Sequence, residues 1–341
     1  MRLPKLNWGI KSFFNNILNR EGPYSIRLYP VGYMCNHDCV MCWRTKEQKS
    51  RKDYAKAERN SLKIGEYIRL IRSFPSSVKF VDIVGGGEPL LFKELGKLCK
   101  EIKKRNIYGR LITNGALFNK FIINGLKNCT WNEVRISFHA GTKEVYKKIN
   151  GVDDFEKVKA NIKLLVAAAK EKKILKVSML YVIQRDNIDD MVTFVNLAES
   201  LGVDEVEFDY LLPMNTRVLI RKDQQKNILD NLKMVEKKAL LKNNASWAIK
   251  MLSIHPRCGK SDKYFEDKYC INVQSNLDIQ SDGLTMPCCL MPLDIPFTNV
   301  RKQSIQEIWN SYRVFRDTLK KGDFCSFCYE MCNQDLPKRL D

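Results

Sequence analysis

The sequence predicts an α/β fold, in which a parallel sheet is covered by helices and is either doubly wound or curled into a partial barrel. Two observations lead to this prediction. Apolar segments of strand length alternate with segments of helical periodicity about six times between residues 24 and 212. After Pro213 the alternation stops, and a lysine-rich stretch leads into a region where cysteines gather. The 341 residues are sufficient for such a sheet and a second, smaller domain.

The predicted elements follow one another in a regular order. The expected strands span residues 24–33, 78–86, 108–115, 133–141, 174–184 and 203–212. The expected helices span residues 61–74, 93–106, 119–128, 155–172 and 188–202. In a parallel arrangement of this kind the carboxyl ends of all strands lie at one edge, where α/β proteins carry their functional sites.

The composition is that of a globular protein, with 44% hydrophobic and 28% charged residues. No apolar run approaches the ~18 residues that a membrane-spanning helix needs. The chain has twelve cysteines, and no signal peptide is expected to lead it. Thiols at short spacings in such a chain indicate metal binding rather than disulfides, and we expect a reducing, cytoplasmic location.

The net charge of +19 has several possible partners. It could attract nucleic acid, an anionic membrane surface or an anionic substrate. The lysines are scattered among acids, however, and aromatic residues do not alternate with basic runs, so we favour a solvated surface and expect no nucleic acid. An anionic substrate or partner is the alternative. Residues 1–23 form an amphipathic basic extension, which predicts either a membrane-surface or targeting segment or a helix docked on the main domain.

Unusual residues follow four of the predicted strands. Three thiols, Cys35, Cys39 and Cys42, come after the first strand, and the stretch GGGEP, residues 85–89, comes after the second. The third strand ends in TNG, residues 113–115, and the fourth ends with Ser137 and His139. We therefore expect an active site at this edge. Three thiolates can hold a four-iron cluster and leave one iron open for a substrate, whereas a zinc site would require a fourth, distant ligand.

The cysteine spacing and the GGEP stretch resemble the radical S-adenosylmethionine (SAM) superfamily. The resemblance implies a partial (βα)6 barrel and a [4Fe–4S] cluster whose open iron binds SAM, which is cleaved to a 5′-deoxyadenosyl radical. It also implies cofactor-binding roles for Met41 near the adenine, for Gly86, Gly87 and Glu88 near the SAM amino group, and for Ser137. Asn150 stands where many relatives have an arginine, and Lys148 is a possible substitute for that contact.

The C-terminal region resembles the SPASM/twitch iron–sulfur domains, which bind one or two further [4Fe–4S] clusters. The resemblance implies four ligands for one auxiliary cluster: Cys270, Cys288, Cys325 and Cys328. Cys258, Cys289 and Cys332 remain, too few for a second all-cysteine cluster. A zinc ribbon is the alternative for this region.

Four regions are expected: an N-terminal extension at 1–23, the barrel core at 24–215, a helical linker at 216–251 and the auxiliary domain at 252–341. The implied function is hydrogen abstraction from a peptide or small molecule by an oxidoreductase or maturase, with the auxiliary cluster assisting oxidation. A flavodoxin- or ferredoxin-type protein is the implied electron donor. The alternatives are an epimerase with a cysteine hydrogen donor, an RNA-modifying enzyme and a non-catalytic electron-transfer protein. No catalytic residue is assigned; the candidates are His139, Cys289 and Cys332.

Overall fold

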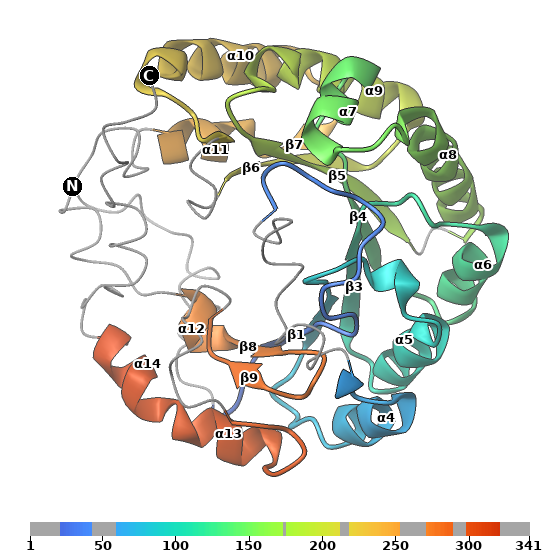
Figure 1. Cartoon of the computed structure of the whole chain (residues 1–341), viewed down its shortest axis with the longest axis vertical. Helices are drawn as coiled ribbons and strands as arrows, with labels where there is room; N and C mark the ends of the chain where they lie inside the picture. Colours follow the sequence, from blue (N-terminus) through green and yellow to red (C-terminus); the bar gives the residue numbers. More distant parts are fainter. Residues whose placement is uncertain are drawn as a thin grey trace.

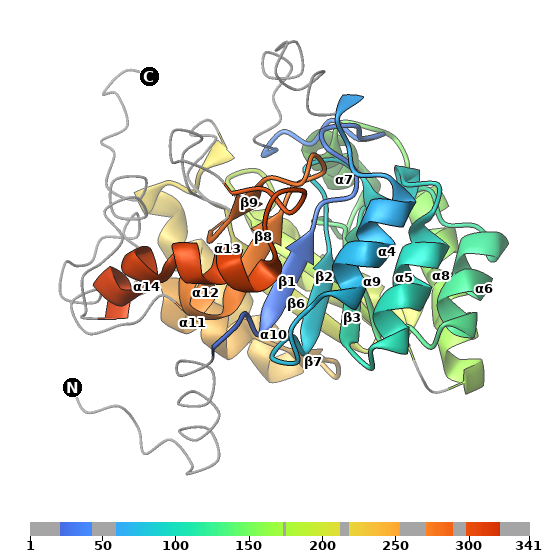
Figure 2. The same cartoon turned by 90° about the horizontal axis from the view of Figure 1, so that it is seen from below.

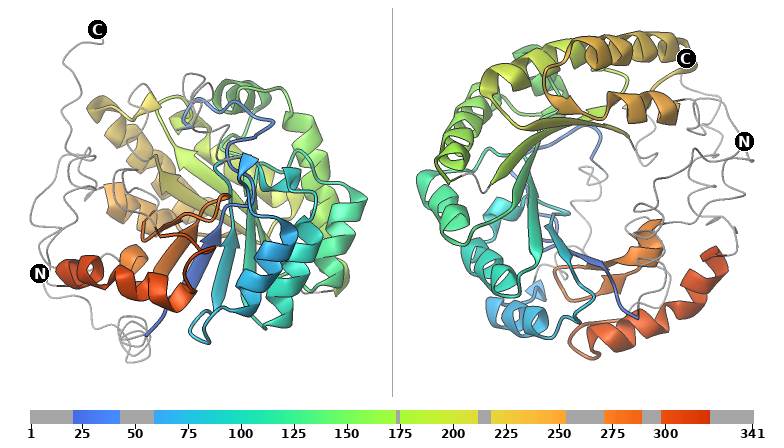
Figure 3. Two further views of the ribbon diagram at one scale, coloured as in Figure 1. Left: turned by 60° about the horizontal axis from the view of Figure 1, so that its bottom comes forward. Right: turned by 180° about the vertical axis from the view of Figure 1, so that it is seen from behind.

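The computed structural model describes residues 21–42, 59–172, 175–211, 218–252, 271–288 and 298–320. A nine-stranded sheet with the order β7-β6-β5-β4-β3-β2-β1-β8-β9 forms its centre. The sheet curls into an open barrel with the helices outside it, as Figure 1 shows. Seen from behind, the strands form the inner layer and the helices the outer layer (Figure 3). The predicted α/β partial barrel is confirmed.

All neighbouring strands are parallel except β8 and β9. The strands of the barrel and its extension are β1 (Ser25–Leu28), β2 (Phe80–Ile83), β3 (Tyr108–Thr113), β4 (Glu133–Ser137), β5 (Lys176–Ile183), β6 (Glu205–Tyr210), β7 (Lys242–Asn243), β8 (Asn276–Ile279) and β9 (Thr285–Met286). The first six of these strands lie within the six predicted strands.

The helices between the strands cover the outer face of the sheet. They are α4 (Ile64–Arg72), α5 (Leu95–Lys104), α6 (Lys120–Asn128), α7 (Lys143–Asn150), α8 (Phe155–Lys172) and α9 (Met191–Leu201). Their ends follow local sequence signals. The side chain of Asn119 accepts a hydrogen bond from the Ile122 amide at the start of α6, and glycines in the left-handed conformation, Gly151 and Gly202, end α7 and α9.

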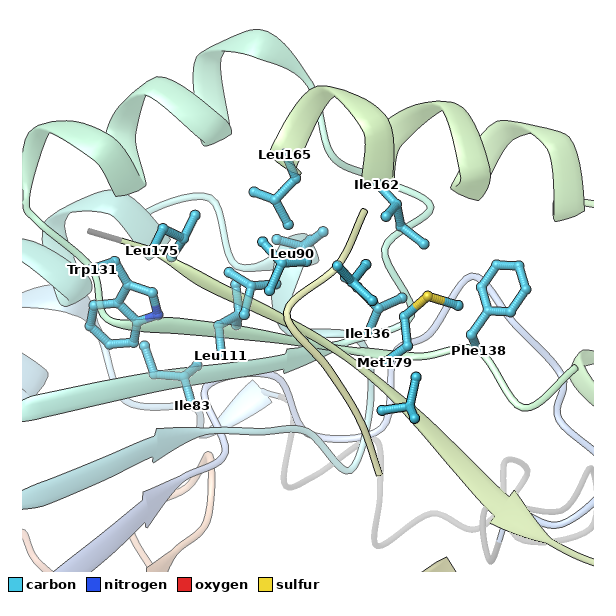
Figure 4. Packing of buried hydrophobic residues seen from close by; sticks show 14 of the residues in the cluster. Ile83, Leu90, Leu111, Trp131, Ile136, Phe138, Ile162, Leu165, Leu175 and Met179 are labelled. Atoms are coloured by element: carbon cyan, nitrogen blue, oxygen red, sulfur yellow. The ribbon is translucent and has the colours of Figure 1, made fainter. Parts of the chain in front are cut away.

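The outer face of the sheet is apolar and forms the main core. Strand residues of alternate positions, among them Leu111, Ile136 and Met179, are completely buried against the helices. Figure 4 shows Ile162 and Leu165 of α8 facing these strand residues, with Trp131 at the end of the cluster. This packing supplies the apolar burial that holds a βα structure together.

The inner face carries the charges of the barrel strands. Arg27, Asp82, Arg110 and Glu133 are neighbours in register across β1 to β4. Since side chains alternate between the two faces of a strand, these four residues point to the opposite side from the apolar core. The strands therefore enclose a lumen with a polar wall.

The C-terminal region adds two strands beside β1. Arg27 lies opposite Asp278 of β8, which runs parallel to β1, and β8 and β9 lie side by side with β1 in Figure 2. The helices α12 (Ile271–Ser275), α13 (Ile305–Ser311) and α14 (Arg313–Lys320) accompany these strands. Arg301 Nε lies 2.7 Å from Glu66 Oε1 on α4, which joins this region to the barrel.

The stretch 216–251, predicted as a helical linker, contains two packed helices. The helix α10 (Gln225–Lys238) buries Ile228, Leu232 and Val235, and α11 (Ala245–Leu252) contributes the buried Ala248. The Tyr210 hydroxyl of β6 donates to the Ala248 carbonyl at 2.8 Å. These helices therefore cover the last barrel strands. The predicted domain boundaries remain a prediction, and residues 1–20 of the predicted extension lie outside the described residues.

Across the described residues, no helix combines the length and the apolar character that crossing a membrane demands.

Candidate active site

The three-cysteine loop lies at the carboxyl end of β1 and is held by the end of α7. Cys35, Cys39 and Cys42 are each half-buried. The Asp38 amide donates to the Asn150 carbonyl at 3.2 Å, and the Val40 amide donates to the Ile149 carbonyl at 2.9 Å. The thiol of Cys39 lies 3.6 Å from Asn150 Oδ1. The loop is thus fixed by a helix more than a hundred residues away in the sequence.

A glycine at position 151 is required for this attachment. Gly151 has φ of +68°, a left-handed conformation that favours glycine. A Cβ atom at this position would lie 2.3 Å from the Asp38 carbonyl oxygen. The helix end and the cysteine loop therefore approach too closely for any other residue.

The glycine-rich loop after β2 lies against the backbone of the cysteine loop. A Cβ at Gly87 would lie 1.9 Å from the Met34 carbonyl oxygen, and one at Gly85 would lie 1.8 Å from the Gly87 carbonyl oxygen. The Glu88 amide donates to the same Met34 carbonyl at 2.7 Å. Gly86 between them is half-buried. This contact places the two predicted cofactor-binding loops side by side.

The Glu88 carboxylate joins this loop to the end of β3. It accepts hydrogen bonds from the Thr113 hydroxyl at 2.5 Å, from the Asn114 amide at 2.9 Å and from the Leu90 amide at 2.9 Å. Burial raises the pKa of Glu88, while these three hydrogen bonds act in the opposite direction. The Glu88 side chain therefore holds the glycine-rich loop at the end of β3. The contact of the Gly87–Glu88 segment with the SAM amino group remains a prediction.

Two asparagines, Asn114 and Asn150, contact the cysteine loop, and no separate role for Asn114 is predicted from the sequence. Asn114 Nδ2 donates to Asn36 Oδ1 at 2.9 Å and lies 3.9 Å from Cys35 Sγ. Asn150 Nδ2 donates to the Phe138 and Tyr146 carbonyls at 3.1 and 3.2 Å. Both amides hold the loop in place by hydrogen bonds to the surrounding backbone and side chains.

Lys148, the suggested substitute for the missing arginine, points to solvent and pairs with Asp186 at 2.8 Å. Ser137 is the last residue of β4 and faces the lumen in register with Leu180. Met41 is half-buried within the cysteine loop. These placements bring Ser137 and Met41 to the predicted edge, while Lys148 is engaged elsewhere.

His139 is buried at the end of β4 and its backbone has φ of +62°. Its Nδ1 accepts a hydrogen bond from the Val182 amide at 3.1 Å, so Nε2 carries the proton. Burial lowers the pKa of His139 to about 3. A neutral imidazole fixed in this way favours a structural role over the catalytic role for which His139 is a candidate.

His37, inside the cysteine loop, is also buried. Its Nε2 lies 3.4 Å from Asp154 Oδ2, too poorly aligned for a hydrogen bond, and its ring meets the Tyr146 ring edge-on with centroids 6.2 Å apart. Burial lowers the pKa of His37. The ring therefore acts as packing beneath the loop.

The auxiliary ligands are described at one position only. Cys288 follows β9 and is half-buried. Cys270, Cys325 and Cys328 lie outside the described residues, as do Cys258, Cys289 and Cys332.

The donor set at the mouth of the barrel fits an iron–sulfur cluster. Within the described ranges, no three His, Cys, Asp or Glu side chains are grouped to hold a single metal ion. A four-iron cluster takes one thiolate for each of three irons, so three half-buried thiols in one loop suit it.

Two family models match the chain. The model of the Radical SAM superfamily matches residues 29–198, and the model of the SPASM iron–sulfur cluster-binding domain matches residues 270–333. Curated relatives include proteins named probable GTP 3′,8-cyclase. The one from Saccharolobus islandicus strain Y.N.15.51 is 26% identical over 205 residues, which are 60% of this chain and 61% of the relative. The one from Metallosphaera sedula is 26% identical over 182 residues, 53% of this chain and 54% of the relative. The match thus spans between 54% and 61% of the length of those two proteins.

Solved structures share the fold. Streptococcus suis SuiB bound to S-adenosylmethionine aligns with a TM-score of 0.66 at 16% identity, covering 85% of this chain and 66% of SuiB. The protein anSMEcpe with bound AdoMet aligns with a TM-score of 0.63 at 18% identity, covering 87% of this chain and 84% of that protein. These likenesses support the partial barrel.

Proposed function

Because this chain belongs to the radical SAM superfamily and carries a C-terminal SPASM domain, we propose that it oxidises a peptide or a small molecule by hydrogen abstraction, assisted by one auxiliary [4Fe–4S] cluster. Membership establishes a radical SAM enzyme with a SAM-binding [4Fe–4S] cluster and auxiliary iron–sulfur binding. The substrate, the oxidative outcome and the single auxiliary cluster are the proposed part.

One observation carries the proposal. The three-thiol loop lies at the carboxyl edge of the barrel. At the end of β3, the backbone amide of Asn114 donates a hydrogen bond to the Glu88 carboxylate, and the side-chain amide of Asn114 lies beside the Cys35 thiol. The reactive centre would therefore stand directly over the lumen, whose wall is polar. When bound, the cluster and SAM supply an organic radical that removes hydrogen from a substrate.

The residues of this chain have binding and positioning roles. Cys35, Cys39 and Cys42 would hold the cluster, and the Gly87–Glu88 backbone, brought against Met34, would present peptide groups to SAM. Ser137 would offer a hydroxyl from the lumen side, and Met41 an apolar surface for the adenine. The amide of Asn150 and the tight turn at Gly151 keep the loop from shifting.

Cyclisation of GTP is the named activity of the curated relatives, and the described lumen offers it little support. A triphosphate would need unpaired basic groups. Arg27, Arg110 and Arg135 already pair with lumen carboxylates. SuiB has been solved bound to its precursor peptide SuiA, and anSMEcpe with bound AdoMet and the Cp18Cys peptide, which keeps a peptide among the proposed substrates.

The test is anaerobic reconstitution followed by reduction, either with dithionite or with a flavodoxin- or ferredoxin-type donor. We expect 5′-deoxyadenosine and methionine from SAM, and about eight irons per chain, corresponding to two [4Fe–4S] clusters. Twelve irons would contradict the single auxiliary cluster. Bound zinc with no SAM cleavage would contradict the whole proposal.

A further inference from the structure

The inference concerns the charges inside the barrel, and it rests on the proposed function because it takes the lumen as the substrate chamber. Every charged residue of β1 to β6 and β8 occupies an inward-facing position. The acids are Asp82, Glu133, Glu205, Glu207, Asp209 and Asp278, and the bases are Arg27, Arg110, Arg135 and Lys176. Lys242 of β7, in register with Glu205, adds a fifth base, so six acids against five bases leave the strand wall with a net negative charge, although the whole chain has a net charge of +19.

The two carboxylates around β1 have arginine partners. Asp82 lies 2.6 Å from Arg110 and 3.8 Å from Arg27. Asp278 lies 3.8 Å from Arg27. The charges of Asp82 and Asp278 are therefore both compensated by neighbouring arginines.

The glutamates on the opposite side are paired as well. Arg135 pairs with Glu207 and lies 3.8 Å from Glu133. Lys176 lies 3.8 Å from Glu133 and 2.7 Å from Glu205. Five of the six lumen acids thus have a base within 4 Å.

Asp209 is the exception. The side chain is exposed, and its hydrogen bond is the one its Oδ1 accepts from the adjacent Tyr210 amide at 2.8 Å. No basic side chain of the described ranges lies within ion-pair distance of it.

Asp209 lies near the carboxyl ends of the barrel strands, as the candidate active site does. Leu180 of β5 is the register neighbour of both Ser137 and Glu207. Asp209 is opposite Val182, one inward-facing step beyond that layer. The carboxylate therefore lies at the edge where the cysteine loop ends, above the paired charges of the lower lumen.

We propose that Asp209 recognises the substrate by binding a protonated amine. A carboxylate without a basic partner on an acidic strand wall favours a cationic ligand, because the ligand supplies an opposite charge and a charge-assisted hydrogen bond. A lysine side chain or amino terminus of a peptide and the ammonium group of a small molecule share this chemistry. The proposal replaces the anionic substrate suggested by the net charge of the whole chain.

The experiment uses the full-length, reconstituted protein in the presence of SAM. The probes are Nα-acetyl-lysine amide and the neutral isostere Nα-acetyl-norleucine amide, and dissociation constants are measured by calorimetry. We expect the wild type to prefer the lysine probe by about tenfold, the order of one charge-assisted hydrogen bond. In Asp209→Asn this preference falls below about twofold, and Asp209→Glu keeps part of it.

Asp230→Asn is the matched control, since Asp230 is an exposed aspartate on α10 outside the barrel; it should keep the wild-type preference. Asp209→Asn leaves no described base unpaired, so the fold should persist, which circular dichroism checks. An undiminished preference in Asp209→Asn overturns the inference. A tenfold loss of SAM affinity in that variant also overturns it, because the carboxylate would then belong to the SAM site. Failure of SAM cleavage in the wild type would instead strike the proposed function, while the probe preference would still report on Asp209.

Discussion

The two faces of the barrel sheet differ in chemistry and in what they do. The outer face is apolar, with Ile136 and Met179 completely buried against the helices. The inner face carries paired charges such as Asp82 with Arg110. Apolar burial supplies most of the free energy of folding, whereas a largely buried ion pair adds little to it, because the desolvation of the two charges offsets their attraction. Stability therefore resides mainly on the outer face, which leaves the residues of the inner face free to be selected for ligand binding.

The largest expected effect comes from the cysteine loop. Replacing Cys35, Cys39 and Cys42 together with Ala should abolish SAM cleavage and lower the iron content by about four atoms per chain, since one cluster loses all its ligands. The fold should survive, because none of the three thiols belongs to the apolar core. Iron analysis, a cleavage assay and circular dichroism measure the three quantities. Unchanged iron content would show that the ligands lie elsewhere.

The second effect compares neighbouring residues of β3 that point to opposite faces. Leu111 is completely buried on the outer face, and Ile112 is half-buried on the inner face. Leu111→Ala should lower the free energy of unfolding by about 2–5 kcal/mol, through lost apolar contact and the cavity that remains.

Ile112→Ala should cost less than half as much in the same chemical denaturation experiment, because its side chain keeps contact with solvent in the native protein. Equal losses at the two positions would break the distinction between the faces.

How much of this arrangement can be predicted from the sequence depends on how far apart in the chain the interacting residues lie. The strands, the helices and the three-cysteine loop are local patterns, so alternation and short spacing located them. The attachment of Asn150 to Cys39 joins residues 111 positions apart, and the pairing of β8 with β1 joins segments about 250 positions apart. No local pattern contains such contacts.

The polar lumen could have been predicted in part. EVEFDY, residues 205–210, alternates acids with apolar residues, and this period of two indicates one buried and one polar face. Which acids pair could not have been deduced, because pairing depends on the register of neighbouring strands. The positioning role of Glu88 was hidden for the same reason, since its partners lie at the end of another strand.

A third experiment examines the junction of the glycine-rich loop with the cysteine loop. Gly87→Ala would place a Cβ 1.9 Å from the Met34 carbonyl oxygen, so the two loops must separate. We expect SAM affinity to fall by about tenfold or more, as when a polar contact of the bound ligand is lost. Equilibrium dialysis with SAM gives the measurement.

Gly96→Ala is the matched control, since a Cβ on this glycine of α5 meets nothing within 4 Å. That variant should bind SAM normally and gain about 0.5–1 kcal/mol of stability, because alanine favours the helix. Wild-type SAM affinity in Gly87→Ala would show that the glycine-rich loop has been assigned the wrong role.

The smallest expected effect is a pH dependence at His139, where β4 leaves the sheet. Burial lowers the pKa of this imidazole to about 3, whereas an unfolded chain gives about 6.5. Between these values the unfolded state binds the additional proton, so the free energy of unfolding decreases as the pH falls from about 6.5 toward 3, by at most about 1.4 kcal/mol per pH unit.

His139→Asn removes this titration and suits the backbone, because asparagine tolerates the φ of +62° better than most residues. It gives up the hydrogen bond to the Val182 amide, which lowers stability by a similar amount at every pH. Urea denaturation at pH 7, 6 and 5 separates the two contributions. The free energy of unfolding of the wild type should exceed that of the variant by less and less as the pH falls. A constant difference would mean that His139 has the same pKa in the folded and the unfolded protein, and its candidacy as a catalytic residue would then regain support.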